Sequence, residues 1–247
     1  MSTRGSRPSI DELKAVAQPP SIFARNSGEH WAGRLYVRRL SPYLTRAVIP
    51  TRVTPNAMTW TMVLVGVLAA VCMAIDSVWA ALGAVVLIQL QILLDCSDGE
   101  LARWRGSFSP VGIYLDRIAH YVTETLFPIA LGIRADEPVL GLVAAVLALA
   151  VRTETALVAV ARLESGREAA EDSAVVAAPQ VTLLARVRGA VGFFPFFRAF
   201  IAVEASVLSL LALVLGLTDE LVIALVPIAA ITAVGHLLAI VTSARLR

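Results

Sequence analysis

Charge and cysteine are both scarce in this chain of 247 residues. Charged residues make up 16% of the sequence, whereas ordinary soluble domains contain about 25%. The two cysteines, Cys72 and Cys96, are too few for a disulfide framework, which excludes the small disulfide-stabilised secreted domains. The formal net charge of +2 is too small to indicate a nucleic-acid partner. No short apolar segment lies near the start, so we expect no cleavable signal peptide.

Hydrophobic residues are abundant instead. They make up 57% of the chain, and the mean hydropathy is +0.76, which excludes a disordered protein. Several apolar runs approach or exceed the roughly 20 residues that a helix needs to cross a bilayer. The sequence therefore predicts an all-α integral membrane protein.

The polar N-terminal part divides into two segments. Residues 1–28 lack a sustained apolar period, and we predict a disordered cytoplasmic tail there. In residues 29–50 apolar side chains recur at helical spacing while arginines occupy other faces. This pattern predicts a juxtamembrane amphipathic helix in the headgroup region, with a solvated linker helix as the alternative.

Residues 51–247 are predicted to form a domain of six transmembrane helices, at about 56–75, 78–97, 111–133, 138–162, 197–217 and 220–243. The connections after the first, third and fifth helices contain one cation, Arg134, whereas the other two contain several arginines. The positive-inside rule then places both termini in the cytoplasm and the protein in the inner membrane. The loop at 164–195 either covers a cytoplasmic opening or only links two helices.

Four polar side chains stand out in the second and third predicted helices. Asp95 and Asp98 lie one turn apart on one helix, and Asp116 and His120 lie one turn apart on the next. A charge at a helix centre in the membrane costs at least about 2.5–3.5 kcal/mol, so such groups indicate function. If the two helices pack, all four converge near the cytoplasmic surface. Three carboxylates there require a cation, and we predict Mg²⁺ or Mn²⁺.

Two further residues of the same segment suit a phosphate ligand. Gly99 lets a ligand approach the backbone, and Arg103 supplies a planar cationic fork for phosphate oxygens. Carboxylates, a divalent metal, glycine and arginine together indicate a nucleotide diphosphate and a phosphoryl-type transfer.

These residues resemble the signature of the CDP-alcohol phosphotransferases, D-x2-D-G-x2-A-R-x8-G-x3-D-x3-D. Seven of the eight fixed positions agree at the required spacing, and the resemblance covers roughly residues 30–245. It implies an enzyme of phospholipid biosynthesis that moves a phosphatidyl or related phosphoalcohol group from a CDP-linked donor to an acceptor hydroxyl, with release of CMP. The expected donor is CDP-diacylglycerol, the expected acceptor is an alcohol or a sugar phosphate, and relatives are commonly homodimers.

The resemblance also implies roles for the motif residues. Asp95, Asp98 and Asp116 would hold two metal ions, while Gly99 and Arg103 would contact the CDP portion.

Four other residues fall near the nucleotide by the same resemblance. Gly112 is part of the signature, and Ser109 matches a position that is often small and polar. Asn56 and Thr59 resemble the start of the family's first helix, with helix capping as the alternative.

One signature position differs. The family's fourth aspartate is the general base, and this chain has His120 there. Either His120 is a substituted base and metal ligand, which would favour Mn²⁺, or the site binds without turnover. Glu124, one turn further, either orients the imidazole or pairs with an arginine such as Arg152.

Arginines of the later helices are candidates for the acceptor site. In relatives with a phosphorylated acceptor such arginines bind that phosphate, which points to Arg152 and Arg198, and more weakly to Arg117. The alternative is interhelical pairing, for example of Arg152 with Glu204. Two other functions stay open for the chain: a catalytically silent homologue that binds a CDP-lipid or a partner, and a small transporter, against which the lack of internal repeats counts.

Overall fold

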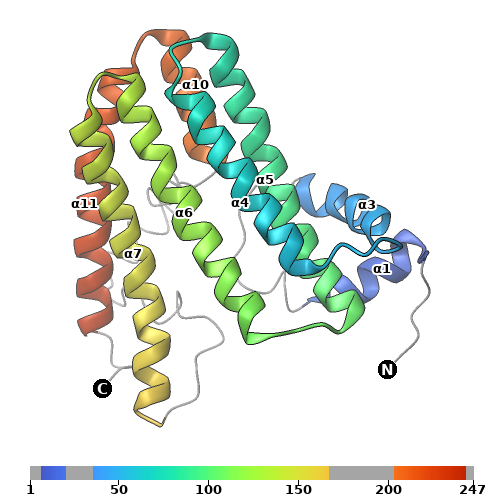
Figure 1. The fold of residues 1–247 in the computed structure, drawn as a ribbon. Helices are drawn as coiled ribbons and strands as arrows, with labels where there is room; N and C mark the ends of the chain where they lie inside the picture. The colour runs from blue at the N-terminus through green and yellow to red at the C-terminus, as the bar shows by residue number, and fades with distance from the viewer. Residues whose placement is uncertain (1–6, 21–35, 167–202, 243–247) are drawn as a thin grey trace.

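The computed structural model describes residues 7–20, 36–166 and 203–242, and over these ranges the chain forms helices and no strands (Figure 1). This confirms the predicted all-α class. The helices are α1 (Ile10–Ala17), α3 (Arg38–Val48), α4 (Pro55–Ala74), α5 (Val78–Arg105), α6 (Pro110–Arg134), α7 (Pro138–Glu164), α10 (Val203–Leu215) and α11 (Thr218–Thr242).

Helices occupy the positions predicted for all six spans, and four of them are long and apolar enough to cross a membrane. These four are α4, α5, α7 and the Thr218–Leu238 part of α11. Helix α6 has 25 residues but carries charged side chains, and the apolar helix at Ser206–Leu215 is short. Residues 197–202 of the fifth predicted span lie outside the described ranges. The apolar helices support an integral membrane protein.

Helix α4 packs against both α5 and α6. It thus holds together the two helices that carry the two halves of the aspartate motif. Helix α6 in turn packs on α7, α7 on α11, and α10 on α5 and α11 (Figure 1). The α6–α7 crossing is close because both helices have glycine there: a Cβ atom on Gly132 would lie 2.7 Å from the Cα of Gly141. Small residues at such crossings are typical of membrane helices.

Helix signals in the sequence fix one end of this bundle. Helix α4 begins at Pro55, after Thr54 accepts a hydrogen bond from the Ala57 N–H, and α6 begins at Pro110 after the cap of Ser109. Helix α5 ends at Arg105 and is followed by Gly106, whose φ of 62° is a left-handed conformation that glycine adopts without strain. We call this end, where α5 ends and α4 and α6 begin, the motif end.

Two arginines fix the backbone at the two ends of α4. At the motif end, Arg105 donates to the carbonyls of Ile49, Thr51 and Val53. These hydrogen bonds hold the connection that leads into α4. At the opposite end, Arg134 donates to carbonyls at the C-terminus of α4 and in the turn after it. The start of α4 is therefore anchored directly to the last residue of α5.

The predicted disordered tail over 1–28 is wrong for residues 10–17, which form α1. Ser9 and Glu12 form a capping box, in which each side chain accepts a hydrogen bond from the other residue's backbone N–H. Leu13 and Ala17 are fully buried, and α1 packs against α3 and α5. Tertiary burial of two side chains thus stabilises a helix that is too short to be stable alone.

Helix α3 falls within the juxtamembrane helix that was predicted at 29–50. Residues 29–35 of that prediction lie outside the described ranges. The helix turns a polar side inward. Ser41 and Thr45 are buried, whereas Leu40 and Tyr43 are 51% and 60% exposed. Its placement in the headgroup region stays a prediction.

Candidate active site

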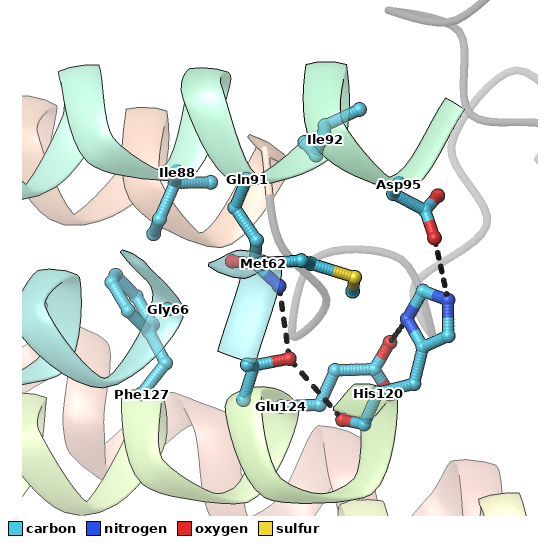
Figure 2. Close-up of a pocket in the computed structure, with 10 residues that line it drawn as sticks. Met62, Gly66, Ile88, Gln91, Ile92, Asp95, His120, Glu124 and Phe127 are labelled. Carbon is cyan, nitrogen blue, oxygen red and sulfur yellow. Dashed lines mark hydrogen bonds and ion pairs between the residues drawn. The ribbon is translucent and has the colours of Figure 1, made fainter. Parts of the chain in front are cut away.

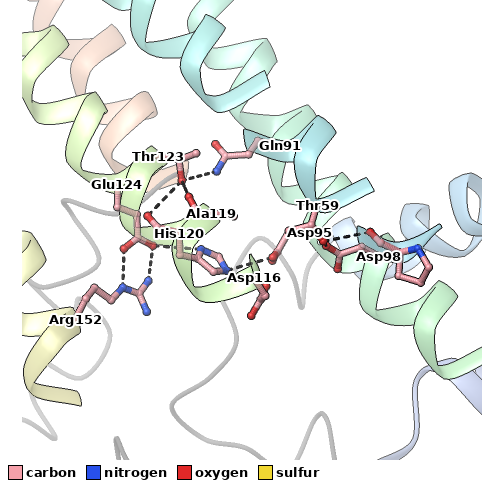
Figure 3. Close-up of polar contacts among 11 residues, drawn as sticks. Thr59, Gln91, Asp95, Asp98, Asp116, Ala119, His120, Thr123, Glu124 and Arg152 are labelled. Carbon is pink, nitrogen blue, oxygen red and sulfur yellow. Dashed lines mark hydrogen bonds and ion pairs between the residues drawn. The ribbon is translucent and has the colours of Figure 1, made fainter. Parts of the chain in front are cut away.

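Helices α5 and α6 bring three of the predicted metal ligands together at the motif end. One ligand atom each of Asp95, Asp116 and His120 lies within 4.8 Å of the others. The His120 Nε2 atom is 3.2 Å from Oδ1 of Asp95 and 3.8 Å from Oδ1 of Asp116 (Figure 3). The Asp116 side chain is 48% exposed, so the group is open on that side.

Asp98 lies beside this group and is not part of it. Its Oδ2 atom accepts a hydrogen bond of 2.6 Å from the Thr59 hydroxyl of α4, and the residue is buried (Figure 3). The structure brings three of the four predicted side chains within ligand distance of one another, and the role of Asp98 as a metal ligand stays a prediction.

The donor set fits a divalent cation. Two carboxylates and an imidazole nitrogen are ligands that Mn²⁺ accepts readily, and carboxylates alone suit Mg²⁺. Asp98, with one oxygen bonded to Thr59, adds a further carboxylate next to the group.

The second ring nitrogen of His120 faces Glu124. Its Nδ1 atom is 3.5 Å from Oε1 of Glu124, whose side chain is 5% exposed. Glu124 is also bound by Arg152 of α7: Nε donates to Oε2 over 2.6 Å, and a guanidinium Nη donates to Oε1. The two alternatives for Glu124, contact with His120 or pairing with Arg152, are thus present together (Figure 3).

The arginines proposed for the acceptor differ in their surroundings. The guanidinium of Arg152 is bound to the Glu124 carboxylate, and Glu124 in turn contacts His120. Arg117 is exposed on α6. Arg198 and the side chain of Glu204 lie outside what the structure describes.

The nucleotide candidates gather where α4 and α6 begin. A Cβ atom on Gly112 would lie 3.2 Å from Oδ1 of Asn56 and 3.4 Å from Oγ of Ser109. The capping alternative is wrong for Asn56 and Thr59, because Thr54 caps α4. Ser109 does cap its helix, accepting a hydrogen bond of 3.0 Å from the Gly112 N–H.

Arg103 lies over Gly99, and α1 holds it there. A Cβ atom on Gly99 would be 3.2 and 3.3 Å from the two terminal nitrogens of Arg103. The Nε atom of Arg103 donates to the Ala17 carbonyl over 2.5 Å. Sequence reasoning missed the helix α1 and with it this contact, although Ser9 and Glu12 at capping-box spacing were a signal for a helix there.

A pocket extends from Asp95 and His120 between α4, α5 and α6 (Figure 2). Apolar side chains, among them Met62, Ile88 and Phe127, form much of its wall. Gln91 and Thr123 also line it and are joined by a hydrogen bond of 2.9 Å. Sequence reasoning missed these two residues, whose polarity in apolar helices was the available signal.

Fold and site together define a helical membrane protein with a group of acidic and imidazole side chains that could hold a metal ion. The family model for CDP-alcohol phosphatidyltransferases matches residues 52–234, which is most of the chain and includes the whole motif. The chain therefore belongs to the CDP-alcohol phosphatidyltransferase family, whose members generally depend on divalent metal ions.

Several curated proteins of archaea are similar to part of the chain. A bifunctional IPC transferase and DIPP synthase of Thermococcus kodakarensis is 30% identical over 116 residues, which are 47% of this chain and 26% of that protein. An archaetidylinositol phosphate synthase of Aeropyrum pernix is 30% identical over 105 residues, which are 42% of this chain and 53% of that protein. The chain thus spans about half or less of the length of these relatives.

Proposed function

We propose that this protein is a metal-dependent CDP-alcohol phosphotransferase of phospholipid biosynthesis. It moves a phosphatidyl or related phosphoalcohol group from a CDP-linked lipid, such as CDP-diacylglycerol, to an acceptor hydroxyl and releases CMP. The observation that carries this proposal is the meeting of Asp95, Asp116 and His120, with Asp98 and the Arg103–Gly99 pair beside them, at the signature spacing.

Asp95, Asp98 and Asp116 are the residues that would hold two divalent ions. When bound, such ions neutralise the diphosphate and stabilise the charge that develops on CMP as it leaves. Arg103, held over Gly99, adds a fixed cationic fork for phosphate oxygens on the same side. Asn56, Ser109 and Gly112 line the adjacent surface, where the rest of the nucleotide binds.

His120 is the general base of the proposed reaction. To act as the base, the ring must carry its proton on Nδ1, which faces the Glu124 carboxylate, and a lone pair on Nε2. Nε2 takes the proton of the acceptor hydroxyl, and the acceptor oxygen forms a bond to the phosphorus that carries the lipid. The bond from that phosphorus to the bridging oxygen breaks, and its electron pair leaves with CMP.

The proposed acceptor is an alcohol or a sugar phosphate. Similarity to an archaetidylinositol phosphate synthase makes an inositol phosphate the first acceptor to test, followed by glycerol phosphate and unphosphorylated polyols. Arg198 and Arg117 are the candidates for the acceptor phosphate. Arg152 is a weaker candidate, since its guanidinium is bound to Glu124.

The proposal includes six spans, cytoplasmic termini, an active site at the cytoplasmic face and a homodimer. Charge at the two ends of the bundle supports this orientation. The motif end carries a set of arginines, namely Arg38, Arg39, Arg46, Arg52, Arg103 and Arg105. The opposite end carries acidic residues beside Arg134, namely Asp76, Asp136 and Glu137.

A CMP-release assay tests the activity. Purified protein is mixed with CDP-diacylglycerol, Mg²⁺ or Mn²⁺, and a pool of inositol phosphate, glycerol phosphate and polyols. We expect CMP release that is lost in Asp98→Asn and in His120→Ala. Asp76→Asn, at the opposite end of the bundle with a side chain that is 95% exposed, is the matched control and keeps activity.

The replacement of the family's fourth aspartate by His120 favours one other function, a silent homologue that binds a CDP-lipid without turnover. Binding of CDP without CMP release under any of these conditions would establish that function. Absence of both binding and release would contradict both.

A further inference from the structure

A fully buried carboxylate lies on α5 directly after Gly99. Glu100 has no exposed surface, and its partners come from outside the bundle core. Its Oε1 atom accepts hydrogen bonds from the Ser41 hydroxyl at 2.5 Å and the Gln18 amide at 2.8 Å, and Oε2 accepts one from Thr45 at 2.8 Å. A buried charge is tolerated only with such partners, so Glu100 binds α3 and the residue after α1 to the motif end.

The C-terminus of α1 is held at the same place. Gln18, whose amide also donates to the Arg38 carbonyl, follows the last residue of the helix. Leu13 and Ala17 are fully buried against α3 and α5. The orientation of α1 is therefore fixed by apolar burial along one side and by the amide of Gln18 at its end.

This orientation directs a backbone carbonyl at Arg103. The carbonyls of the last helical turn lack intrahelical partners and carry partial negative charge. The Ala17 carbonyl belongs to this set and accepts the Nε–H of Arg103 over 2.5 Å. With Nε held in this way, the two terminal nitrogens lie over Gly99.

We propose that α1 is a positioning element for the nucleotide site: it holds the Arg103 guanidinium over Gly99, with Glu100 and Gln18 fixing α1 in turn. The ligand is the diphosphate of a cytidine nucleotide, and this step rests on the proposed function, which places CDP at Arg103. Ala17, Gln18 and Glu100 are positioning residues and do not touch the nucleotide. An arginine already fixed loses less freedom on binding, so α1 increases nucleotide affinity.

The test uses CDP itself, titrated with Mg²⁺ into the full-length purified protein by calorimetry. Leu13→Asp places a charge on the buried side of α1 and displaces the helix, whereas Ala15→Asp places the same charge on its exposed side. We expect the Kd for CDP to rise about tenfold in Leu13→Asp and to stay unchanged in Ala15→Asp. Gln18→Ala, which leaves the buried apolar side intact, should raise the Kd about threefold.

A double-mutant cycle separates positioning from general damage. If α1 acts through Arg103, Leu13→Asp has no further effect on the Kd for CDP in an Arg103→Ala background. A loss that adds in full to that of Arg103→Ala overturns the inference, as does an unchanged Kd in Leu13→Asp. Mn²⁺ binding, followed by electron paramagnetic resonance, should be retained in all variants, because α1 does not touch Asp95, Asp116 or His120; its loss in Leu13→Asp also counts against a local role.

The two proposals fail in different ways. Wild-type protein that binds no CDP contradicts the proposed function. Wild-type protein that binds CDP, with additive effects in the cycle, contradicts the role of α1 alone.

Discussion

The two ring nitrogens of His120 have different neighbours, and this difference limits what the residue can do. Nδ1 faces Glu124, whereas Nε2 faces Asp95 and Asp116. With its proton on Nδ1, the ring has a single lone pair, which either binds a metal ion or accepts a proton from the acceptor. An aspartate has two oxygens and can do both at once. With His in place of the family's Asp, the residue at this position therefore serves as the base or as a metal ligand, and not as both at once.

Removal of the charge on Glu124 tests its role in orienting His120. Glu124→Gln keeps the size of the side chain but removes the charge that fixes the Nδ1–H tautomer, so we expect CMP release to fall by about ten- to a hundredfold. Binding of CDP should be unchanged, because Glu124 does not reach the Arg103–Gly99 pair. Glu154→Gln is the matched control, since it alters another carboxylate–imidazole pair, with His236 at 2.9 Å, outside the site. Full activity of Glu124→Gln would contradict the role.

The choice of metal is a second property of His120 that can be measured. Imidazole nitrogen is a better ligand for Mn²⁺ than for Mg²⁺, whereas carboxylate suits both. Because the single lone pair of Nε2 is assigned to the base, we expect the ratio of CMP release with Mn²⁺ to release with Mg²⁺ to be equal in the wild type and in His120→Asp. A higher ratio in the wild type would show that Nε2 binds the metal and would contradict its role as the base.

The meeting of Asp95, Asp116 and His120 was predictable from the sequence because helical spacing decides most of it. Asp116 and His120 at i and i+4 must share a face, and Asp95 joins them because α4 packs against both α5 and α6. The partner of Asp98 was not predictable, since the contact with Thr59 depends on how α4 packs on α5. The double contact of Glu124 likewise depends on the position of α7.

At the scale of single elements, α5 is longer than its hydropathy predicts. We predicted an end near residue 97, because charged residues follow, whereas the helix continues to Arg105. The polar residues after 97 stay helical because each finds partners: Asp98 on α4, Glu100 on α3 and after α1, and Arg103 on α1. Such partners come from distant segments and are invisible to a local apolar pattern.

Helix α1 gives a prediction about pH. Hydrogen bonds from Ser9, first from its backbone and then from its side chain, hold the pKa of Glu12 below its ordinary value of 4.5. A carboxylate with a lowered pKa in the folded state stabilises that state above its unfolded pKa, and the contribution is lost as the pH falls through the folded pKa. We therefore expect hydrogen-exchange protection of residues 10–17 to weaken below about pH 4.5.

The matched variant for this effect is Glu12→Gln, which keeps a capping-box side chain but cannot titrate. Its protection over residues 10–17 should lack the acid-dependent step of the wild type, while protection of α5 stays the same in both proteins. An acid-dependent step of equal size in Glu12→Gln would assign the effect to another group.

At the scale of the whole molecule, the bundle has two chemically different ends. The motif end gathers the acidic motif, its arginines and α1 and α3, whereas the other end carries short turns around Arg134 (Figure 1). The sequence predicted a helix in each of these six regions, of which the fifth is described only from residue 203, because the apolar runs are separated by proline, glycine and charge. It did not predict which helices touch, since lipid-facing and protein-facing apolar side chains look alike in sequence.

The orientation of these two ends in the membrane is the last prediction. Because arginines concentrate at the motif end, the positive-inside rule places it in the cytoplasm. After Cys72→Ala and Cys96→Ala remove the native thiols, Ser107→Cys reports on the motif end and Asp76→Cys on the opposite end; both positions are exposed. With a membrane-impermeant maleimide, we expect Asp76→Cys to react in intact cells and Ser107→Cys only after permeabilisation. The reverse pattern would put the metal-binding group outside the cell, away from cytoplasmic nucleotides, and labelling of both from one side would contradict the transbilayer bundle itself.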